Sequence, residues 1–153
     1  MEAMKEIHLI AHNIRSAENI GSLLRTSDAL GIGKVWLSGY SPTPEHPRVL
    51  KTALGAEMSV AWEPVTDILE ILAQLRREDF RIVGLEIDRR AIPLTKYHAP
   101  QRIALLLGNE VEGVTPSLLD VCDDVISIQQ YGIKESLNVS FAAAIAAHWM
   151  LNI

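Results

Sequence analysis

Short apolar runs of strand length alternate along this chain with segments whose apolar residues recur at helical spacing. Such alternation is typical of an α/β domain, in which helices connect mainly parallel strands and cover both faces of one sheet. The runs at 80–87 and 102–107 are strongly apolar, as strands buried on both faces are. The sequence predicts six strands, at residues 5–11, 34–37, 58–62, 80–87, 102–107 and 125–128.

The segments between these strands carry helix signals. An apolar stripe at 19–30 predicts a helix that stops at Gly31, and Thr66 is expected to cap a second helix. Thr115 before Pro116 places a cap residue ahead of a proline at the first helical position. The last helix, expected at 136–152, is so rich in alanine and apolar residues that it should be buried on most sides. Prolines at 42, 44 and 47 predict a long irregular loop there.

Length and composition exclude several classes of protein. The 153 residues fit one domain, and a single cysteine, Cys122, excludes an intrachain disulfide. No Cys/His spacing suggests a metal site, no secretory signal is recognisable, and no apolar run reaches the roughly 18 residues of a membrane helix. We therefore expect a soluble cytoplasmic protein with no bound metal and no membrane segment. The net charge of −5 argues against coating of nucleic acid by bulk electrostatics, so any such contact must be local.

Three segments carry more glycine, asparagine and charged residues than their positions require. In the first, at 12–32, a strand leads into a polar loop and a helix that carries Asn19 and Arg25. In the second, at 105–116, a buried strand ends in Gly108 and Glu110, where ligands bind in open α/β sheets and where glycine permits close approach. As structure alone, Asn19 would start a helix and Arg25 would be a surface arginine.

The third segment, at 125–140, is a strand followed by a glycine-containing loop and the start of the last helix. Ser136 can be interpreted as the N-cap of that helix, which leaves Asn138 in the first turn without a structural role. Other chemistries lack their signatures. The Gly-Ile-Gly sequence at 31–33 follows a helix and is no dinucleotide fingerprint, no GxSxG elbow is present, and the five histidines show no metal spacing.

In this order and at these positions, the three segments resemble the three motifs of the SpoU/TrmH branch of the knotted SPOUT methyltransferases. The first motif is an Asn followed by Gly and Arg-Thr, the second is Gly-Asn-Glu with a later Gly, and the third is Ser-Leu-Asn-Val-Ser followed by small residues. The resemblance covers nearly the whole chain. The matching residues are Asn19, Gly21, Arg25 and Thr26; Gly108, Asn109, Glu110 and Gly113; and residues 136–140 with 142–144.

This resemblance implies a single α/β domain over residues 1–153, with a mostly parallel six-stranded sheet flanked by helices. It implies a deep trefoil knot in the C-terminal part, about residues 103–153, and a homodimer. It also implies a methyltransferase that carries a methyl group from S-adenosylmethionine to a ribose 2′-hydroxyl of tRNA or rRNA. With no separate RNA-binding domain expected, the catalytic domain would have to bind RNA by itself.

The resemblance also implies roles for individual residues. Four side chains are expected to face the ribose and phosphate as catalytic residues: Asn19, Arg25, Glu110 and Asn138. Backbone and apolar contacts are expected to hold the cofactor, from Leu85, Gly108, Ile128, Ser136 and Leu137. Basic residues in or beside loops are expected to contact RNA: Arg15, Arg48, Lys51 and Lys134. We expect a side chain at position 108 to occupy the space into which the adenosine packs.

Some points stay open at the level of the sequence. The third motif is usually preceded by Ile-Pro-Met, whereas this chain has Gln129 and Gln130 after Ile128, which affects how the adenosine packs. Arg25 is either a transient base or an orienting phosphate clamp, and the difficulty of deprotonating any arginine at neutral pH favours the clamp. A catalytically silent RNA-binding or cofactor-sensing protein of the same fold is the alternative function. Base methylation, as in the related tRNA guanine-N1 branch, would lack the Asn-Gly-Arg opening.

Overall fold

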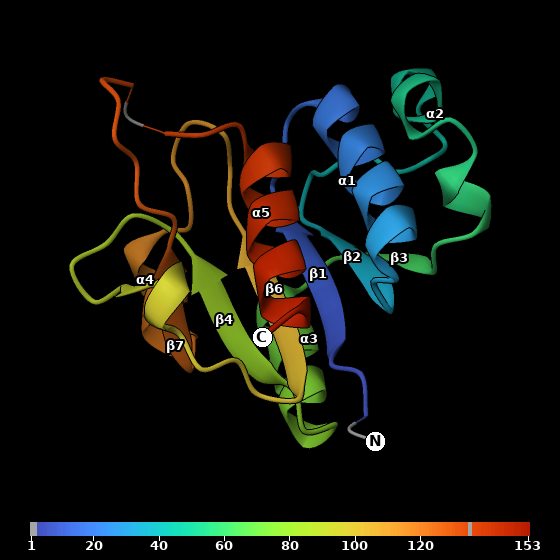
Figure 1. Cartoon of the computed structure of the whole chain (residues 1–153). Helices are drawn as coiled ribbons and strands as arrows, with labels where there is room; N and C mark the ends of the chain where they lie inside the picture. Colours follow the sequence, from blue (N-terminus) through green and yellow to red (C-terminus); the bar gives the residue numbers. More distant parts are fainter. Residues whose placement is uncertain (1–2, 135) are drawn as a thin grey trace.

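A computed structural model describes residues 3–134 and 136–153 and contains a seven-stranded parallel sheet. The strand order is β3-β2-β1-β6-β4-β7-β5, with β1 and β6 in the middle (Figure 1). The strands are β1 (Glu6–His12), β2 (Lys34–Ser38), β3 (Trp62–Val65), β4 (Arg81–Leu85), β5 (Ile92–Pro93), β6 (Arg102–Leu107) and β7 (Asp124–Ser127).

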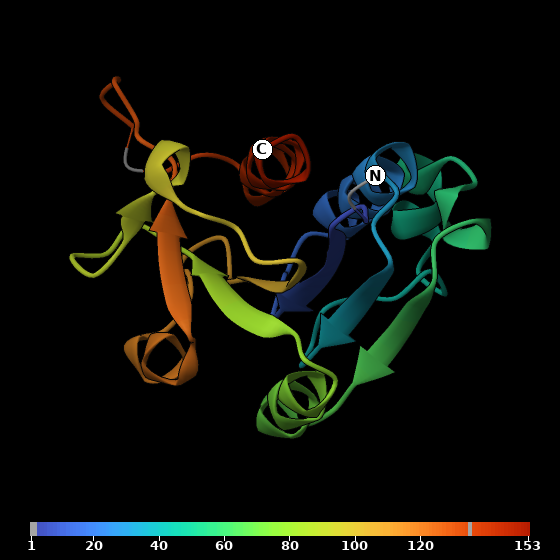
Figure 2. The ribbon, with the colours of Figure 1, turned by 60° about the horizontal axis from the view of Figure 1, so that its bottom comes forward.

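Helices cover both faces of this sheet, so the molecule has three layers (Figure 2). One face carries α1 (Ala17–Leu30), α2 (Pro47–Ala53) and α5 (Val139–Leu151), and the other carries α3 (Ile68–Arg77) and α4 (Pro116–Val121). Two short 3₁₀ helices, η1 (Ala56–Met58) and η2 (Leu94–Lys96), lie in connections. No helix among the described residues is both long and apolar enough to cross a membrane.

The register of the central strands brings several loops to one edge of the sheet. Ala11, the residue before the last in β1, lies beside Leu107, the last residue of β6. Leu85, the last residue of β4, lies beside Ile126 of β7. Because neighbouring strands are parallel, the chain leaves β1, β4, β6 and β7 on the same side. This carboxyl edge is where open α/β sheets place their ligands.

The expected α/β class with a mainly parallel sheet is confirmed, but the number of strands was wrong. The seventh strand is β5, only two residues long, which pairs with β7 at the sheet edge. The strand expected at 58–62 was also misplaced. Ala56–Met58 forms a 3₁₀ turn after Gly55, and the strand that pairs with β2 begins at Trp62. The C-terminal knot stays a prediction.

The helix starts differ from the expected ones because side chains one or two residues away make the capping bonds. Asp67, not Thr66, caps α3 by accepting from the N–H groups of Leu69 and Glu70. The last helix begins at Val139, not at Ser136. The proline-rich stretch is not wholly irregular either, because Pro47 occupies the first turn of α2, where its missing N–H costs no hydrogen bond.

Candidate functional site

A pocket of about 240 Å³ opens at the carboxyl edge of the sheet. Its walls come from the chain after β4, the loop after β6, the chain after β7 and the first residues of α5. Sequence segments 20 to 50 residues apart therefore meet in one place, because each follows a strand of the same sheet. The lining residues are Leu85, Glu86, Ile87, Leu107, Gly108, Asn109, Glu110, Ile128, Gln130, Ser136, Leu137, Asn138, Val139 and Ala142.

All five residues expected to bind the cofactor lie in the wall of this pocket: Leu85, Gly108, Ile128, Ser136 and Leu137. Leu85 ends β4, Gly108 follows β6, and Ile128 follows β7. Ser136 and Leu137 precede α5 and are exposed to solvent. The structure thus brings the second and third sequence motifs together around one cavity.

The reason given for Gly108 was wrong. A Cβ atom at position 108 would lie 2.2 Å from the carbonyl carbon of Gly113 and 2.3 Å from the backbone nitrogen of Val114. The space beside Gly108 is therefore filled by the protein's own chain. The glycine lets the loop after β6 fold back against its start, where Gly113 N–H donates to the Asn109 carbonyl at 2.8 Å. It shapes the pocket wall indirectly.

Three of the four expected catalytic residues form one hydrogen-bonded network at the rim of the pocket. Asn138 Nδ2 donates to Asn19 Oδ1 at 3.1 Å. Asn19 Nδ2 in turn donates to Glu110 Oε2 at 3.0 Å. This network links the start of α5, the first turn of α1 and the loop after β6, and it contains one residue from each sequence motif.

Asn138 has a structural role, although the sequence alone suggested none for it. It is the N-cap of α5, and its Oδ1 accepts from the N–H of Ser140 at 2.9 Å and of Phe141 at 3.4 Å. Because Oδ1 is occupied in this way, Nδ2 is directed at Asn19. The cap therefore fixes the orientation of the amide at the rim of the pocket.

Glu110 is held by the start of α1. Its Oε1 accepts from the backbone N–H of Arg15 and its Oε2 from that of Ser16, each at 2.9 Å. Partial burial raises the pKa of this carboxyl, but the bonds from Arg15, Ser16 and Asn19 outweigh it, and the net pKa lies below its usual value. A carboxylate with a lowered pKa is a weak base at neutral pH, so this geometry favours a positioning role.

Arg25 is not part of this hydrogen-bonded network. It is six residues beyond Asn19 on α1, which places it roughly 120° around the helix and about 9 Å along it. Its side chain is exposed and lines a separate shallow cleft with Ser22, Lys51 and Leu54 among others. The structure of the chain thus separates Arg25 from the pocket that it was expected to serve.

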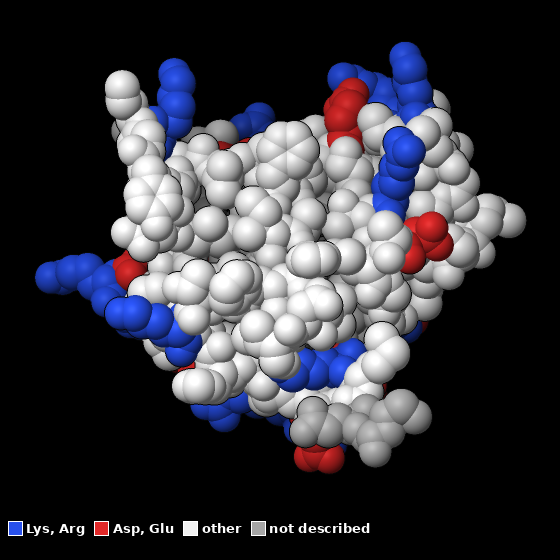
Figure 3. Space-filling model, viewed as in Figure 1, with Lys and Arg blue, Asp and Glu red and all other residues white. Residues whose placement is uncertain are grey.

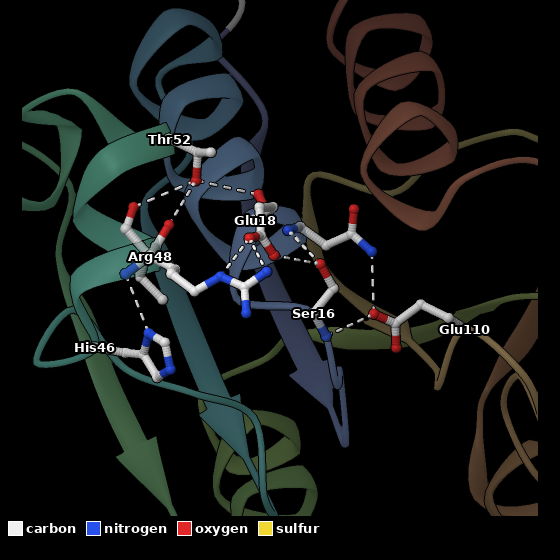
Figure 4. A network of polar contacts seen from close by, with 8 residues as sticks. Ser16, Glu18, His46, Arg48, Thr52 and Glu110 are labelled. Atoms are coloured by element: carbon white, nitrogen blue, oxygen red, sulfur yellow. Dashed lines mark hydrogen bonds and ion pairs between the residues drawn. The ribbon is translucent and has the colours of Figure 1, made fainter.

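The four basic residues expected to contact RNA lie in three places. Arg15 and Arg48 line a second cleft, beside Asn19 and Glu110. Lys51 lies with Arg25 in the separate cleft, and Lys134 is exposed in the loop after β7. Arg48 is not a free cation, because its guanidinium contacts the Glu18 carboxylate at 2.6 Å, across the gap between α2 and α1 (Figure 4).

Several pocket residues were missed from the sequence. Glu86 carries the strongest unused signal, because a carboxylate directly follows the apolar run of β4. Its Oε2 accepts from the Val114 N–H at 2.9 Å, which ties the chain after β4 to the loop after β6. Gln130 also lies in the wall of the pocket. Among the described residues, no group of three His, Cys, Asp or Glu could hold a metal ion.

Known proteins match the chain along nearly its whole length. It is 30% identical over 141 residues to the 23S rRNA (guanosine-2'-O-)-methyltransferase RlmB of Acinetobacter baylyi, covering 92% of this chain and 57% of that protein. It is 27% identical over 142 residues to the tRNA (guanosine(18)-2'-O)-methyltransferase of Aquifex aeolicus, covering 92% of this chain and 66% of that protein. The chain thus spans less than two thirds of the length of either relative.

The fold has a close counterpart among solved structures. The SpoU methyltransferase AviRb from Streptomyces viridochromogenes, solved in complex with AdoMet, superposes with a TM-score of 0.86 at 24% identity. The superposition covers 99% of this chain and 58% of that one. The profile of the SpoU rRNA Methylase family matches residues 6–148. Since this match includes every strand and all three motifs, the chain belongs to the SpoU rRNA methylase family.

Proposed function

We propose that this chain transfers a methyl group from S-adenosylmethionine to a ribose 2′-hydroxyl of tRNA or rRNA. The observation that carries the proposal is that the pocket has the hydrogen-bonded network Asn138–Asn19–Glu110 at its rim. The relatives named above, which are 2′-O-methyltransferases of rRNA and tRNA, support the same reaction. We also propose that the C-terminal part, about residues 103–153, is knotted, and that the protein acts in the cytoplasm.

The pocket suits a nucleoside cofactor. Leu85, Leu107 and Ile128 offer an apolar wall for a ring system, and the Glu86 carboxylate lies at the same cavity. When bound there, S-adenosylmethionine would supply an electrophilic methyl group. The residues of the chain would bind it, exclude water and hold the ribose oxygen in line with that methyl group, and such orientation can contribute ~7–11 kcal/mol to catalysis.

The rim residues would position the ribose. Asn19 and Asn138 present amides whose orientation is fixed by Glu110 and by the cap of α5. Arg25 would clamp the phosphate beside the attacking hydroxyl, because its guanidinium forms paired charge-assisted hydrogen bonds. Since Arg25 faces away from the pocket of its own subunit, we propose that it serves the pocket of a second copy.

A homodimer would also cover the apolar face of α5. Phe141, Ile145 and Trp149 are spaced four residues apart and are 64%, 45% and 38% exposed. Figure 3 shows the area over α5 as a broad uncharged surface with Lys and Arg around its edge. A contiguous apolar surface of this kind marks an interface, and a second copy would bury it symmetrically.

A Trp149→Glu variant is therefore expected to be monomeric at micromolar concentrations at which the unchanged protein is dimeric. An unpaired carboxylate buried in the interface should weaken association at least ~100-fold. Light scattering measures the mass. Leu69→Glu on the opposite face, where Leu69 is 58% exposed on α3, is the matched control and should stay dimeric. A monomeric unchanged protein, or a dimeric Trp149→Glu variant, would contradict the proposed interface.

The reaction itself is tested by mass spectrometry of nucleosides from tRNA and rRNA of cells with and without the gene. We expect one 2′-O-methylated nucleoside to disappear and to return when the purified protein and S-adenosylmethionine are added to RNA from the deleted strain. Calorimetry should detect binding of S-adenosylmethionine to the protein alone. A protein that binds RNA or cofactor but restores no methylated nucleoside would instead be the catalytically silent relative.

A further inference from the structure

A second cleft lies beside the proposed methyl-transfer site and is not needed to hold the cofactor. It has a volume of about 690 Å³ and lies between the start of α1, the loop from β2 to α2, and the loop after β6. Asn19 and Glu110, which belong to the hydrogen-bonded network at the pocket rim, also line this cleft. A ribose held by these residues would therefore have its attached base directed toward the second cleft or its mouth.

Tyr40 is an exposed but immobilised aromatic side chain in this cleft. It is 59% exposed, yet its hydroxyl accepts a hydrogen bond from Asn109 Nδ2 at 2.7 Å. Its backbone N–H donates to Asn13 Oδ1 at 3.1 Å. The preceding Gly39 has φ +64°, and a Cβ there would lie 1.8 Å from Asn13 Oδ1. The loop thus uses a glycine and two asparagines to fix a ring whose face is left to solvent.

The other walls combine apolar surface with one ion pair. Val111, 77% exposed, and the half-buried Pro42 lie in the cleft with Tyr40. Arg48 Nε donates to Glu18 Oε1 at 2.7 Å, and Ser16 Oγ donates to Glu18 Oε2 at 3.2 Å, as Figure 4 shows. The pair therefore presents a carboxylate and a guanidinium, an acceptor and a donor, side by side and still partly exposed.

We propose that this cleft binds the base of the nucleotide that is methylated, with Tyr40 as the stacking surface and the Glu18–Arg48 pair at the base edge. The proposal rests on the proposed methyl-transfer function, because it takes the ribose to lie at Asn19 and Glu110. Proteins hold unstacked RNA bases in this way, with an aromatic ring on the flat face and polar groups on the Watson–Crick edge.

The Glu18–Arg48 pair suits the Watson–Crick edge of guanine. Guanine presents N–H donors, which suit a carboxylate, next to the carbonyl oxygen O6, which suits a guanidinium. Adenine also presents a donor next to an acceptor, its amino group beside N1, so the pair alone does not select guanine over adenine. Glu18 retains about one free acceptor site, on Oε2, because Arg48 Nε and Nη2 contact Oε1 and Ser16 Oγ donates to Oε2.

The test uses the four nucleoside 5′-monophosphates as probes, titrated by NMR onto the protein saturated with S-adenosylhomocysteine. GMP is expected to shift the amide signals of Tyr40 and Val111, and the other three nucleotides rank the base preference of the cleft. Tyr40→Ala should weaken GMP binding at least ~10-fold, because one base–aromatic stack is lost, whereas Tyr40→Phe should stay within about threefold. Glu18→Gln should weaken GMP binding, because the negative charge that accepts a guanine N–H group is removed.

The outcomes separate this proposal from the proposed function. Unchanged GMP affinity in Tyr40→Ala, or shifts confined to residues outside the cleft, would overturn the base-binding cleft even if methyl transfer is normal. A protein that fails to bind S-adenosylhomocysteine but whose GMP binding depends on Tyr40 would contradict the proposed function and still support the cleft. S-adenosylhomocysteine affinity should change much less than GMP affinity in the Tyr40 variants, because Tyr40 does not line the cofactor pocket and contacts it only through Asn109.

Discussion

Arg25→Ala is expected to bind S-adenosylmethionine like the unchanged protein and to transfer methyl groups at least ~100-fold more slowly. Arg25 is exposed on α1, so its removal should change the free energy of unfolding by no more than about 0.5 kcal/mol. If its guanidinium clamps the phosphate beside the attacking hydroxyl, the transition state loses charge-assisted bonds worth ~3 kcal/mol. Single-turnover methylation of an RNA that the unchanged protein modifies measures the difference.

Two control variants test whether the expected loss of activity is specific to the guanidinium of Arg25. Arg77→Ala removes an equally exposed helical arginine from α3, on the opposite face of the sheet, and should leave turnover intact. Arg25→Lys should rescue little activity, because lysine cannot form the paired hydrogen bonds. Near-normal single-turnover methylation by Arg25→Ala would return Arg25 to the role of a surface residue.

A mixture of variants tests whether Arg25 acts across the dimer. Arg25→Ala and Asn138→Ala would each be inactive alone, but a mixed dimer would contain one pocket with its own Asn138 and the partner's intact Arg25. Random mixing should then restore about a quarter of the unchanged activity, since half of the dimers are mixed and each has one complete site. No recovery would place Arg25 and the pocket in the same subunit.

Much of the fold follows from patterns that act over a few residues. β6 was predicted at its observed bounds, because an unbroken apolar run of strand length leaves few alternatives to a buried central strand. The strand near residue 60 was misplaced, because Gly55 has φ +92° and turns the chain into η1 before the ladder with β2 begins. Caps were missed by one or two residues, because Thr66 and Asp67 are both suitable N-caps and geometry selects between them.

The sequence predicted the parts of the site that lie in a motif. It did not predict the parts that form where two distant segments meet. The glycine, asparagine and serine residues of the second and third motifs led to the pocket, since they follow strands that end at one edge. The Glu18–Arg48 pair depends on α2 packing beside α1, and the fixed Tyr40 depends on bonds to Asn13 and Asn109. No local pattern specifies these contacts between distant segments. For the same reason, the sequence could not reveal that Gly108 faces Gly113 and not the adenosine.

Gly108→Ala is expected to lower both the stability of the protein and its affinity for S-adenosylmethionine. The added Cβ, 2.2 Å from Gly113 and 2.3 Å from Val114, must push the returning loop away and pull Val114 N–H from the Glu86 carboxylate. Overpacking of this kind costs ~1–3 kcal/mol, or about 2–12 °C in melting temperature. Because the backbone that lines the pocket moves, the variant should bind the cofactor at least ~10-fold more weakly by calorimetry.

Gly132→Ala is the matched control, because a Cβ at Gly132 meets no atom within 4 Å and Gly132 lies in the loop that precedes α5. It should melt within about 2 °C of the unchanged protein, as surface substitutions do, and bind the cofactor equally well. Gly108→Val adds two further methyl groups to the same collision and is expected to abolish measurable binding. If Gly108→Ala keeps both the melting temperature and the affinity, the close approach of Gly108 to Gly113 does not shape the pocket.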